Sequence, residues 1–206
     1  MVLSLRRRGP GYEENCPVDH SGQGPAGHID ANRPVHVVVL GAAGTGKTTI
    51  GRGLADLLGL PFGEGDDFHS EANRAKMGAG QPLTDEDRWP WLASLRDWMS
   101  EQEAVGRSSV VACSALRADY RDVLREADGD VFFVHLVLPE DVNLERLVAR
   151  QGHFMKPVML GSQRAALEAL GEDEEGIEAI NVGDPIQVVE DLATVLIERF
   201  GARLSA

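Results

Sequence analysis

An eight-residue segment rich in glycine carries the clearest chemical signal in the chain. Residues 41–48 (GAAGTGKT) match the pattern G-x-x-x-x-G-K-S/T at every fixed position. Glycine allows the backbone to come close to phosphate oxygens, and successive N–H groups and a helix N-terminus then face the anion. Lys47 is expected to reach the β- and γ-phosphates, and the Thr48 hydroxyl to hold Mg²⁺. The segment therefore predicts that the chain binds a nucleoside triphosphate.

The elements predicted around this loop have the order that such a site needs. Residues 35–40 (VHVVVL) form a β-branched run typical of a buried parallel strand. Residues 48–58 follow with apolar side chains at helical spacing. A strand, a glycine loop and a helix thus follow one another. The nucleotide-binding residues expected here are Gly41, Ala42, Ala43, Gly44, Thr45, Gly46, Lys47, Thr48 and Thr49.

Strand and helix patterns alternate beyond Pro34. Further strands are expected at residues 60–64, 108–113, 131–137 and 178–182, and helices at 89–103, 117–127, 140–150, 159–170 and 185–200. This alternation predicts an α/β fold: a three-layer α/β/α P-loop NTPase with a mostly parallel sheet and a helical lid. Residues 34–206 are expected to form this one domain. Residues 1–33, rich in glycine, proline and polar residues, are expected to be a disordered extension or to follow a start codon placed too early.

The composition excludes several classes of partner. The 206 residues carry a formal net charge of −13, which argues against nucleic acid because that partner needs a basic footprint. No apolar run approaches the roughly 20 residues of a membrane span, and residues 1–33 lack an apolar stretch suited to a secretory signal. Cys16 and Cys113 are the only cysteines, so a disulfide framework is not expected and a reducing cytoplasm fits best.

Two adjacent carboxylates follow the second predicted strand. Asp66 and Asp67 would lie where open α/β sheets bind ligands, although such a pair can also be a solvated turn. The strand at 108–113 ends in Cys113 and Ser114, without the acidic residue expected of a motor or transport ATPase. The chain also lacks the N-K-x-D motif expected of a GTPase. These features together favour a small-molecule kinase.

The chain resembles the gluconokinases of the small P-loop type, and the resemblance runs from residue 35 to about residue 200. It is carried by Gly65-Asp66-Asp67-Phe68-His69, Asn73, Lys76-Met77, residues 80–88 (GQPLTDEDR), Trp91-Leu92, Cys113-Ser114-Ala115-Leu116, Tyr120-Arg121-Asp122, Leu124-Arg125, Arg146-Leu147, Arg150, Gly152-His153-Phe154, Lys156, Met159-Leu160 and Ser162-Gln163. The sequence departs from the pattern at Glu64, since some relatives have Asp-Gly-Asp where Glu64-Gly65-Asp66 stands, and the role of Glu64 is left open. Arg117 stands where lysine is equally usual.

The resemblance implies an ATP- and Mg²⁺-dependent phosphoryl transfer to D-gluconate. Asp66 would face the acceptor hydroxyl as a base or an orienting acceptor, or would contact Mg²⁺ through water; the sequence does not separate these roles. The gluconate carboxylate and hydroxyls need a cation and hydrogen-bonding groups. The candidates are His69, Arg88, Arg121 and Lys156. A helix-capping role for His69 and a surface ion pair of Arg88 with Asp85 or Asp87 are the alternatives.

Arg146 and Arg150 lie four residues apart and so share one face of the helix at 140–150. A solvated salt-bridge surface is one interpretation of this pair. The helix leads into residues 151–156 (QGHFMK), a glycine-containing loop with polar and cationic groups. The resemblance implies a lid over ATP that excludes water and brings these arginines to the transferring phosphoryl group. Lys47, Asp66 and Arg150 are therefore the expected catalytic residues.

Some roles are less specific. Trp91 and Trp98 are seven residues apart, which favours core packing. The resemblance places adenine near residues 181–185 and implies a homodimer. A shikimate-kinase-like enzyme for another small metabolite is the alternative function. A nucleotide-binding regulatory switch is a second alternative, but it would leave the Asp66, His69 and Arg88 segments unused.

Overall fold

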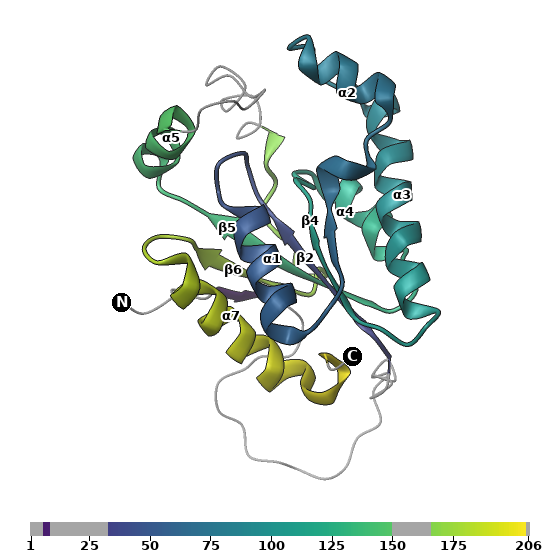
Figure 1. Cartoon of the computed structure of the whole chain (residues 1–206), viewed down its shortest axis with the longest axis vertical. Coiled ribbons are helices and arrows are strands. Elements are labelled where there is room, and N and C mark those ends of the chain that lie inside the picture. The colour runs from purple at the N-terminus through teal and green to yellow at the C-terminus, as the bar shows by residue number, and fades with distance from the viewer. Residues whose placement is uncertain (1–5, 9–32, 150–165, 205–206) are drawn as a thin grey trace.

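A six-stranded sheet forms the centre of the protein (Figure 1). The computed structural model describes residues 6–8, 33–149 and 166–204. The strand order is β1-β6-β5-β2-β4-β3. The strands are β1 Arg6–Arg8, β2 Val35–Leu40, β3 Phe62–Glu64, β4 Ser109–Ala112, β5 Asp130–Val137 and β6 Gly176–Ile180. Strands β2 to β6 pair in parallel, and β1 pairs antiparallel with β6.

Helices cover both faces of this sheet (Figure 1). Helices α1 (Lys47–Leu58) and α7 (Pro185–Phe200) pack on one face, and α3 (Asp85–Glu103) and α4 (Ala118–Arg125) on the other. Successive side chains of β2 point to opposite faces of the sheet, so this strand contributes to both hydrophobic cores. Val37 and Val39 pack in the core under α1 and α7, and Val38 and Leu40 in the core under α3 and α4. Helices α5 (Glu140–Ala149) and α2 (Glu71–Gly78) stand at the upper left and upper right of Figure 1, and two short 3₁₀ turns, η1 (Gly65–Phe68) and η2 (Gly201–Leu204), complete the fold.

This architecture confirms the predicted α/β/α P-loop fold and its mostly parallel sheet. Residues 6–8 differ from the expectation of disorder in the N-terminal segment, because they form strand β1 against β6. The last strand of the sheet is β6 at Gly176–Ile180, two residues before the predicted 178–182. Of the predicted helix at 159–170, residues 159–165 and the preceding loop at 152–158 lie outside the described residues, and residues 167–170 are not helical.

The region between β3 and α3 differs most from the sequence expectation. Helix α3 begins at Asp85 rather than at residue 89, because the Asp87 carboxylate accepts a hydrogen bond from the Thr84 N–H at 3.0 Å and so caps the helix ahead of Pro90. Helix α2 was not predicted. Its one buried side chain is Asn73, whose amide donates to the Asp87 carbonyl at 2.8 Å. A helix anchored by a polar side chain leaves no apolar periodicity in the sequence.

None of the helices in the described part of the chain is long and apolar enough to cross a membrane.

The burial of His36 predicts that the free energy of unfolding depends on pH. This fully buried residue of β2 has Nε2 2.8 Å from the Asp128 carbonyl and Nδ1 2.8 Å from the Ser109 hydroxyl. The carbonyl requires a proton on Nε2, so Nδ1 accepts from Ser109 in the neutral ring. Burial lowers the pKa of His36 from 6.5 to about 4. Because the unfolded chain then binds more protons than the folded chain between these values, the free energy of unfolding should decrease as the pH is lowered through this window, by on the order of 3 kcal/mol.

Thermal or urea unfolding of the wild type and of His36→Gln, from pH 7 to pH 4, measures this effect. Other titrating groups remain in both proteins, so the difference between the two pH profiles isolates His36. We expect the variant to be less stable at pH 7 and to show a shallower loss toward pH 4. Parallel profiles would contradict the role of His36.

Candidate active site

The glycine-rich loop connects the end of β2 to α1 at the upper edge of the sheet (Figure 1). Gly46 is the N-cap of α1 with φ of 93°, and no side chain caps the helix. The first-turn N–H groups of α1 are therefore oriented toward the loop, as anion binding requires. The Lys47 ammonium donates to the Ala42 carbonyl at 3.0 Å, which holds this charge at the loop. The predicted loop residues thus lie together between β2 and the first turn of α1.

Two side chains from distant elements contact the loop at Gly46. A Cβ on Gly46 would lie 2.5 Å from Asn181 Nδ2 and 4.0 Å from Arg146 Nη1. Asn181 follows β6 and donates to the Thr45 carbonyl at 2.6 Å. Glycine is therefore required at position 46 by space as well as by φ. Arg146, on α5, thus has its guanidinium near Gly46, and its binding to the nucleotide stays a prediction.

An acidic group lies at the neighbouring strand ends. Glu64 ends β3, and Asp66 follows it in η1. Gly65 packs directly on β4, since a Cβ there would be 2.5 Å from the Ala112 carbonyl. The Thr48 side chain acts on Glu64, and one Glu64 carboxylate oxygen is buried without a hydrogen-bond partner. Burial raises the pKa of Glu64, and the charges of Asp66 and Asp67 add to this effect.

Cys113 lies at the junction of the loop and the acidic group. It directly follows β4, and its N–H donates to the Val39 carbonyl of β2 at 3.1 Å. A Cβ on Gly65 would lie 3.3 Å from its Cα. Burial raises the pKa of Cys113 to about 12. The thiol is therefore neutral and unsuited to act as a nucleophile.

His69 and Trp91 form a stacked pair beside Asp66. The two rings are 4.3 Å apart at an interplanar angle of 17°, and Trp91 Nε1 donates to the Gly65 carbonyl at 2.7 Å. Trp91 is thus part of the core, as predicted, and also supports the loop that carries Asp66. Burial lowers the pKa of His69, and its Nδ1 is buried without a partner. The helix-capping alternative for His69 is wrong, because Ser70 caps α2 by accepting from the Asn73 N–H at 3.2 Å.

Arg88 is held by a network between α3 and α4. Its Nη1 lies 3.0 Å from the Tyr120 hydroxyl and 3.4 Å from Asp85, so the surface ion pair weighed from the sequence does exist. The Tyr120 hydroxyl in turn donates to Asp85 at 2.6 Å, and Arg117 donates to the same carboxylate at 2.8 Å. The charge of Arg88 also acts on His69. Arg88 is therefore a fixed cation on the side of the site that holds Asp66 and His69.

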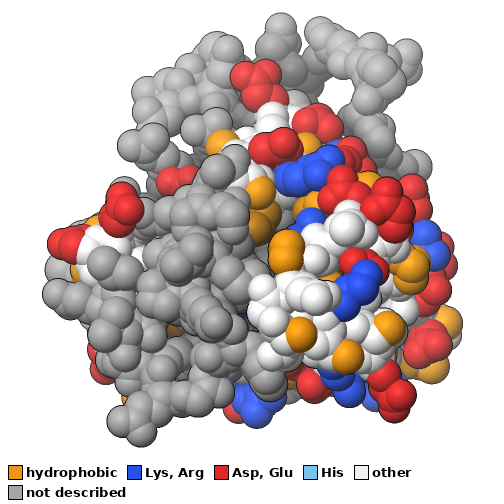
Figure 2. Space-filling view, turned by 90° about the horizontal axis from the view of Figure 1, so that it is seen from above, with side chains coloured by type: hydrophobic (Ala, Val, Ile, Leu, Met, Phe, Trp, Pro, Cys, Tyr) orange, Lys and Arg blue, Asp and Glu red, His pale blue; other side chains and the backbone are white. Residues whose placement is uncertain are grey.

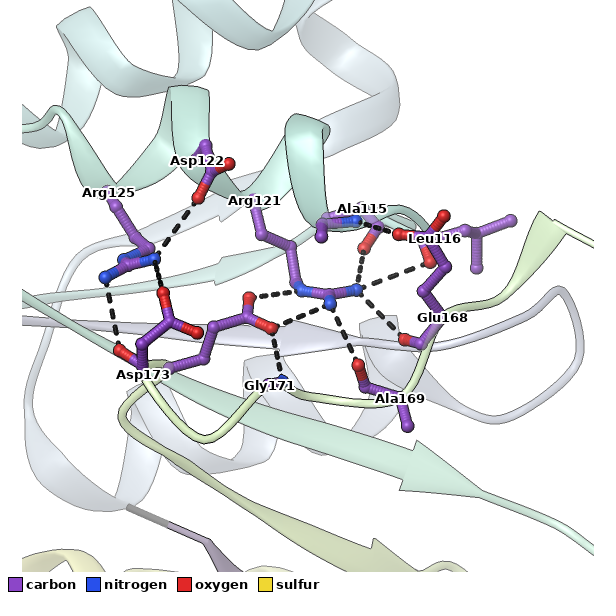
Figure 3. Close-up of polar contacts among 11 residues, drawn as sticks. Ala115, Leu116, Arg121, Asp122, Arg125, Glu168, Ala169, Gly171 and Asp173 are labelled. Atoms are coloured by element: carbon purple, nitrogen blue, oxygen red, sulfur yellow. Dashed lines mark hydrogen bonds and ion pairs between the residues drawn. The ribbon is translucent and has the colours of Figure 1, made fainter. Parts of the chain in front are cut away.

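Arg121 does not lie where the sequence interpretation put it. Its guanidinium is fully buried in an ion pair with Glu174 and donates to backbone carbonyls as well (Figure 3). No N–H group is left to meet a substrate. The prediction of Arg121 as a gluconate ligand is therefore corrected, because the sequence shows its charge but not the acidic partner 53 positions away.

Two of the predicted site residues, Arg150 and Lys156, lie outside the described residues. Glu64 was left without a role, although its position at a strand end next to Asp66 was a usable signal.

Seen from above, the described side chains on this face mix Lys and Arg with Asp and Glu rather than forming one basic field (Figure 2). That mixture suits a small anionic ligand better than a polyanion.

Known proteins share both the sequence and the fold. A family model described as an AAA domain matches residues 37–165. A gluconokinase of Gluconobacter oxydans is 47% identical over 160 residues, covering 78% of this chain and 90% of the relative. An unliganded sugar kinase of Janibacter sp. superimposes with a TM-score of 0.77 at 48% identity, covering 84% of this chain and 99% of that one. A gluconokinase of Sinorhizobium meliloti gives a TM-score of 0.72 at 38% identity, covering 84% and 97%. The chain belongs to the gluconokinase family.

Proposed function

We propose that this chain is an ATP-dependent gluconokinase, which transfers the γ-phosphoryl group of ATP to the 6-hydroxyl of D-gluconate and yields 6-phospho-D-gluconate and ADP. The observation that carries the proposal is the meeting of two groups of side chains at one sheet edge. The phosphate loop follows β2, whose Val39 carbonyl accepts from the Cys113 N–H at 3.1 Å. Gly65, next to Asp66, packs on the same residue, since a Cβ there would lie 3.3 Å from the Cys113 Cα. Asp66 and Arg88 both act on His69. A nucleotide half and a polar acceptor half therefore share one site.

The donor half is suited to positioning the triphosphate. Loop N–H groups and Lys47 would offset the charge on the β- and γ-phosphates, which is the main requirement of phosphoryl transfer. Arg146 lies at Gly46 and would add a cation to the same phosphates. Arg150 is proposed, from the resemblance, to approach the transferring group. The loop beyond Asn181 is proposed to hold adenine.

The acceptor half is suited to a polyhydroxy acid. Arg88 would pair with the gluconate carboxylate, and the unpartnered Nδ1 of His69 offers a hydrogen-bonding site for a hydroxyl. Asp66 would accept the proton of the 6-hydroxyl while that oxygen bonds to the γ-phosphorus and the bond from phosphorus to the β-phosphate oxygen breaks. Lys156 is a further proposed contact of the carboxylate.

The residues around Thr48 fit a magnesium ion. Mg²⁺ binds oxygen ligands and keeps several waters. The Thr48 hydroxyl, the buried unpartnered oxygen of Glu64 and the nearby Asp66 supply oxygens of that kind. When bound, the ion would neutralise developing charge on the β- and γ-phosphate oxygens. Glu64 and Thr48 would hold it, directly or through its waters.

Glu64→Gln tests this assignment because it keeps the shape of the side chain and removes its charge. We expect the Mg²⁺ concentration for half-maximal rate to rise by about 10–100-fold, the usual cost of losing a group that supports a metal ligand. Initial rates against Mg²⁺ at fixed ATP measure the shift. Glu71→Gln, an exposed carboxylate in the first turn of α2, is the matched control. An unchanged midpoint in Glu64→Gln would remove Glu64 from the metal site.

A coupled assay of ADP release decides the substrate. Gluconate, shikimate and nucleoside monophosphates are compared at equal concentration, with ATP and Mg²⁺ present. We expect stimulation by gluconate alone. Stimulation by shikimate would favour the shikimate-kinase-like alternative, and hydrolysis without any acceptor would favour a nucleotide switch. A homodimer and a cytoplasmic location remain predictions, to be tested by sedimentation and by cell fractionation.

A further inference from the structure

Arg121 and Glu174 form an ion pair that is removed from solvent. The side chains are 0% and 3% exposed, and two contacts join them, from Nε to Oε1 at 2.5 Å and from Nη2 to Oε2 at 2.8 Å (Figure 3). Burial of two charges carries a desolvation cost that a well-packed apolar pair avoids. Stability alone therefore gives no reason for an ion pair at this place. The remaining hydrogen bonds of the pair show what else it does.

The guanidinium joins two segments that are about fifty residues apart. Its Nη1 donates to the carbonyls of Leu116 and Glu168 at 3.3 and 3.1 Å, and its Nη2 to the carbonyl of Ala169 at 3.2 Å (Figure 3). Glu174 accepts from the Gly171 N–H at 2.6 Å. The loop between β4 and α4 (residues 113–117) and the segment 166–174 are thus fixed against each other through one buried cation.

Two further hydrogen bonds cross between the same segments. The Glu168 N–H donates to the Leu116 carbonyl at 2.8 Å, and the Ala118 N–H donates to the Glu168 carboxylate at 2.6 Å. These amides report directly on the junction. Both should be protected from hydrogen exchange as long as the junction is closed.

The β4–α4 loop has a backbone conformation that needs support. Ala115 has φ of 32°, the one positive φ of a non-glycine residue in the described chain, and its carbonyl lies 3.4 Å from Arg121 Nη1. Such a conformation is unfavourable for a residue with a Cβ and persists where its surroundings hold it. Arg121 supplies that hold from within the core.

The same loop leads from the phosphate side of the site to the acceptor side. It starts at Cys113, next to Lys47 and Asp66, and ends at Arg117. Arg117 and Tyr120 hold Asp85, and Tyr120 also holds Arg88. A shift of the loop would therefore move the groups that fix the proposed gluconate cation.

We propose that Arg121 and Glu174 are a positioning pair: by fixing the β4–α4 loop against residues 166–174, they align Arg88 through Arg117 and Tyr120 for binding of the acceptor carboxylate. This inference rests on the proposed function. It assigns Arg121 a role in acceptor affinity without contact to the acceptor.

The kinetic test uses Arg121→Lys and the apolar double variant Arg121→Met/Glu174→Leu. Lysine keeps the charge but cannot serve all the acceptors of the guanidinium. The double variant removes both charges, so it leaves no unpaired charge in the core, but it also removes the hydrogen bonds that join the two segments. We expect the KM for gluconate to rise about tenfold in both, the size of one weakened aligning hydrogen bond, while the KM for ATP stays within about twofold. Arg33→Met is the control, since this exposed arginine pairs at 3.2 Å with Asp130, outside both joined segments.

Thermal unfolding separates positioning from stability. The double variant leaves buried backbone carbonyls without a donor and is expected to melt below the wild-type temperature. Both KM values are therefore measured well below that temperature, where the variant is folded, and the KM for gluconate should still be raised. A double variant with wild-type KM for gluconate would overturn the proposal, as would equal increases in both KM values.

Hydrogen exchange keeps the inference testable without gluconate. In Arg121→Lys we expect faster exchange at Ala118 and Glu168 together, with no change at the amides of β2. Unchanged exchange at these two amides would overturn the positioning pair even if the enzyme is a gluconokinase. If the wild type does not phosphorylate gluconate, the proposed function fails, and faster exchange at both amides would still support the junction.

Discussion

Replacing Lys47 by alanine should lower kcat on the order of 10²–10³-fold or more, the effect of removing one donor that stabilises charge in a transition state. The Lys47 ammonium is held at the phosphate loop by the Ala42 carbonyl, in the segment where the loop motif places the triphosphate. The backbone N–H groups of the loop would still bind phosphate, so binding should suffer less than turnover. Steady-state rates with saturating ATP and gluconate measure the loss, and nucleotide titration measures binding.

Two further variants serve as comparisons for Lys47→Ala. Lys47→Arg keeps the charge but replaces a compact ammonium with a planar fork, and we expect it to recover little activity. Arg52→Met removes a cation from the exposed side of the same helix, where it stacks on Phe62 at 5.2 Å, and should leave turnover near the wild-type value. A Lys47→Ala enzyme with kcat within about threefold of wild type would contradict the assignment.

The elements that could be predicted from the sequence are those fixed by residues close to one another in the chain. Apolar periodicity placed β2, α1 and α7 because neighbouring residues in the chain become neighbours on one face. The phosphate loop was predictable for the same reason, since Gly46, Lys47 and the start of α1 are consecutive. Asp66 could be found because it follows a strand, and strand ends meet at one edge of a parallel sheet.

The parts that the sequence did not predict depend on polar contacts between distant residues. Arg88 directly precedes the predicted helix at 89–103 and Arg121 lies within the predicted helix at 117–127, and nothing local shows which of the two is buried. Burial against Glu174 makes the first a core residue, whereas Tyr120 and Asp85 hold the second at the site. The side chain of Asn181 is bonded to Thr45, 136 positions away. Such pairings are fixed by tertiary packing, so residue type and spacing do not reveal them.

The role of Glu64 shows how one contact changes the interpretation of a motif. In the sequence it is a conservative departure from an Asp-Gly-Asp pattern, with no role of its own. In the structure its carboxylate is next to Thr48 and keeps one buried oxygen without a partner. The two carboxylates, Glu64 and Asp66, therefore have different neighbours within the site. Glu64 lies on the side of Thr48, and Asp66 is exposed beside His69. This division favours a metal-linked role for Glu64 and an acceptor-linked role for Asp66.

Asp66→Asn should then lower kcat by about 10²–10⁴-fold, the usual contribution of a positioned general base. Asparagine can still hydrogen-bond the acceptor hydroxyl but cannot take its proton, so the KM for gluconate should change far less than kcat. Raising Mg²⁺ should not restore the rate, in contrast to Glu64→Gln, where excess Mg²⁺ should recover it. Asp67→Asn is the matched control, because Asp67 is the adjacent exposed carboxylate and contacts Arg74 through its carbonyl rather than its side chain. Near-normal turnover in Asp66→Asn would remove Asp66 from the catalytic residues, and recovery at high Mg²⁺ would assign it to the metal instead.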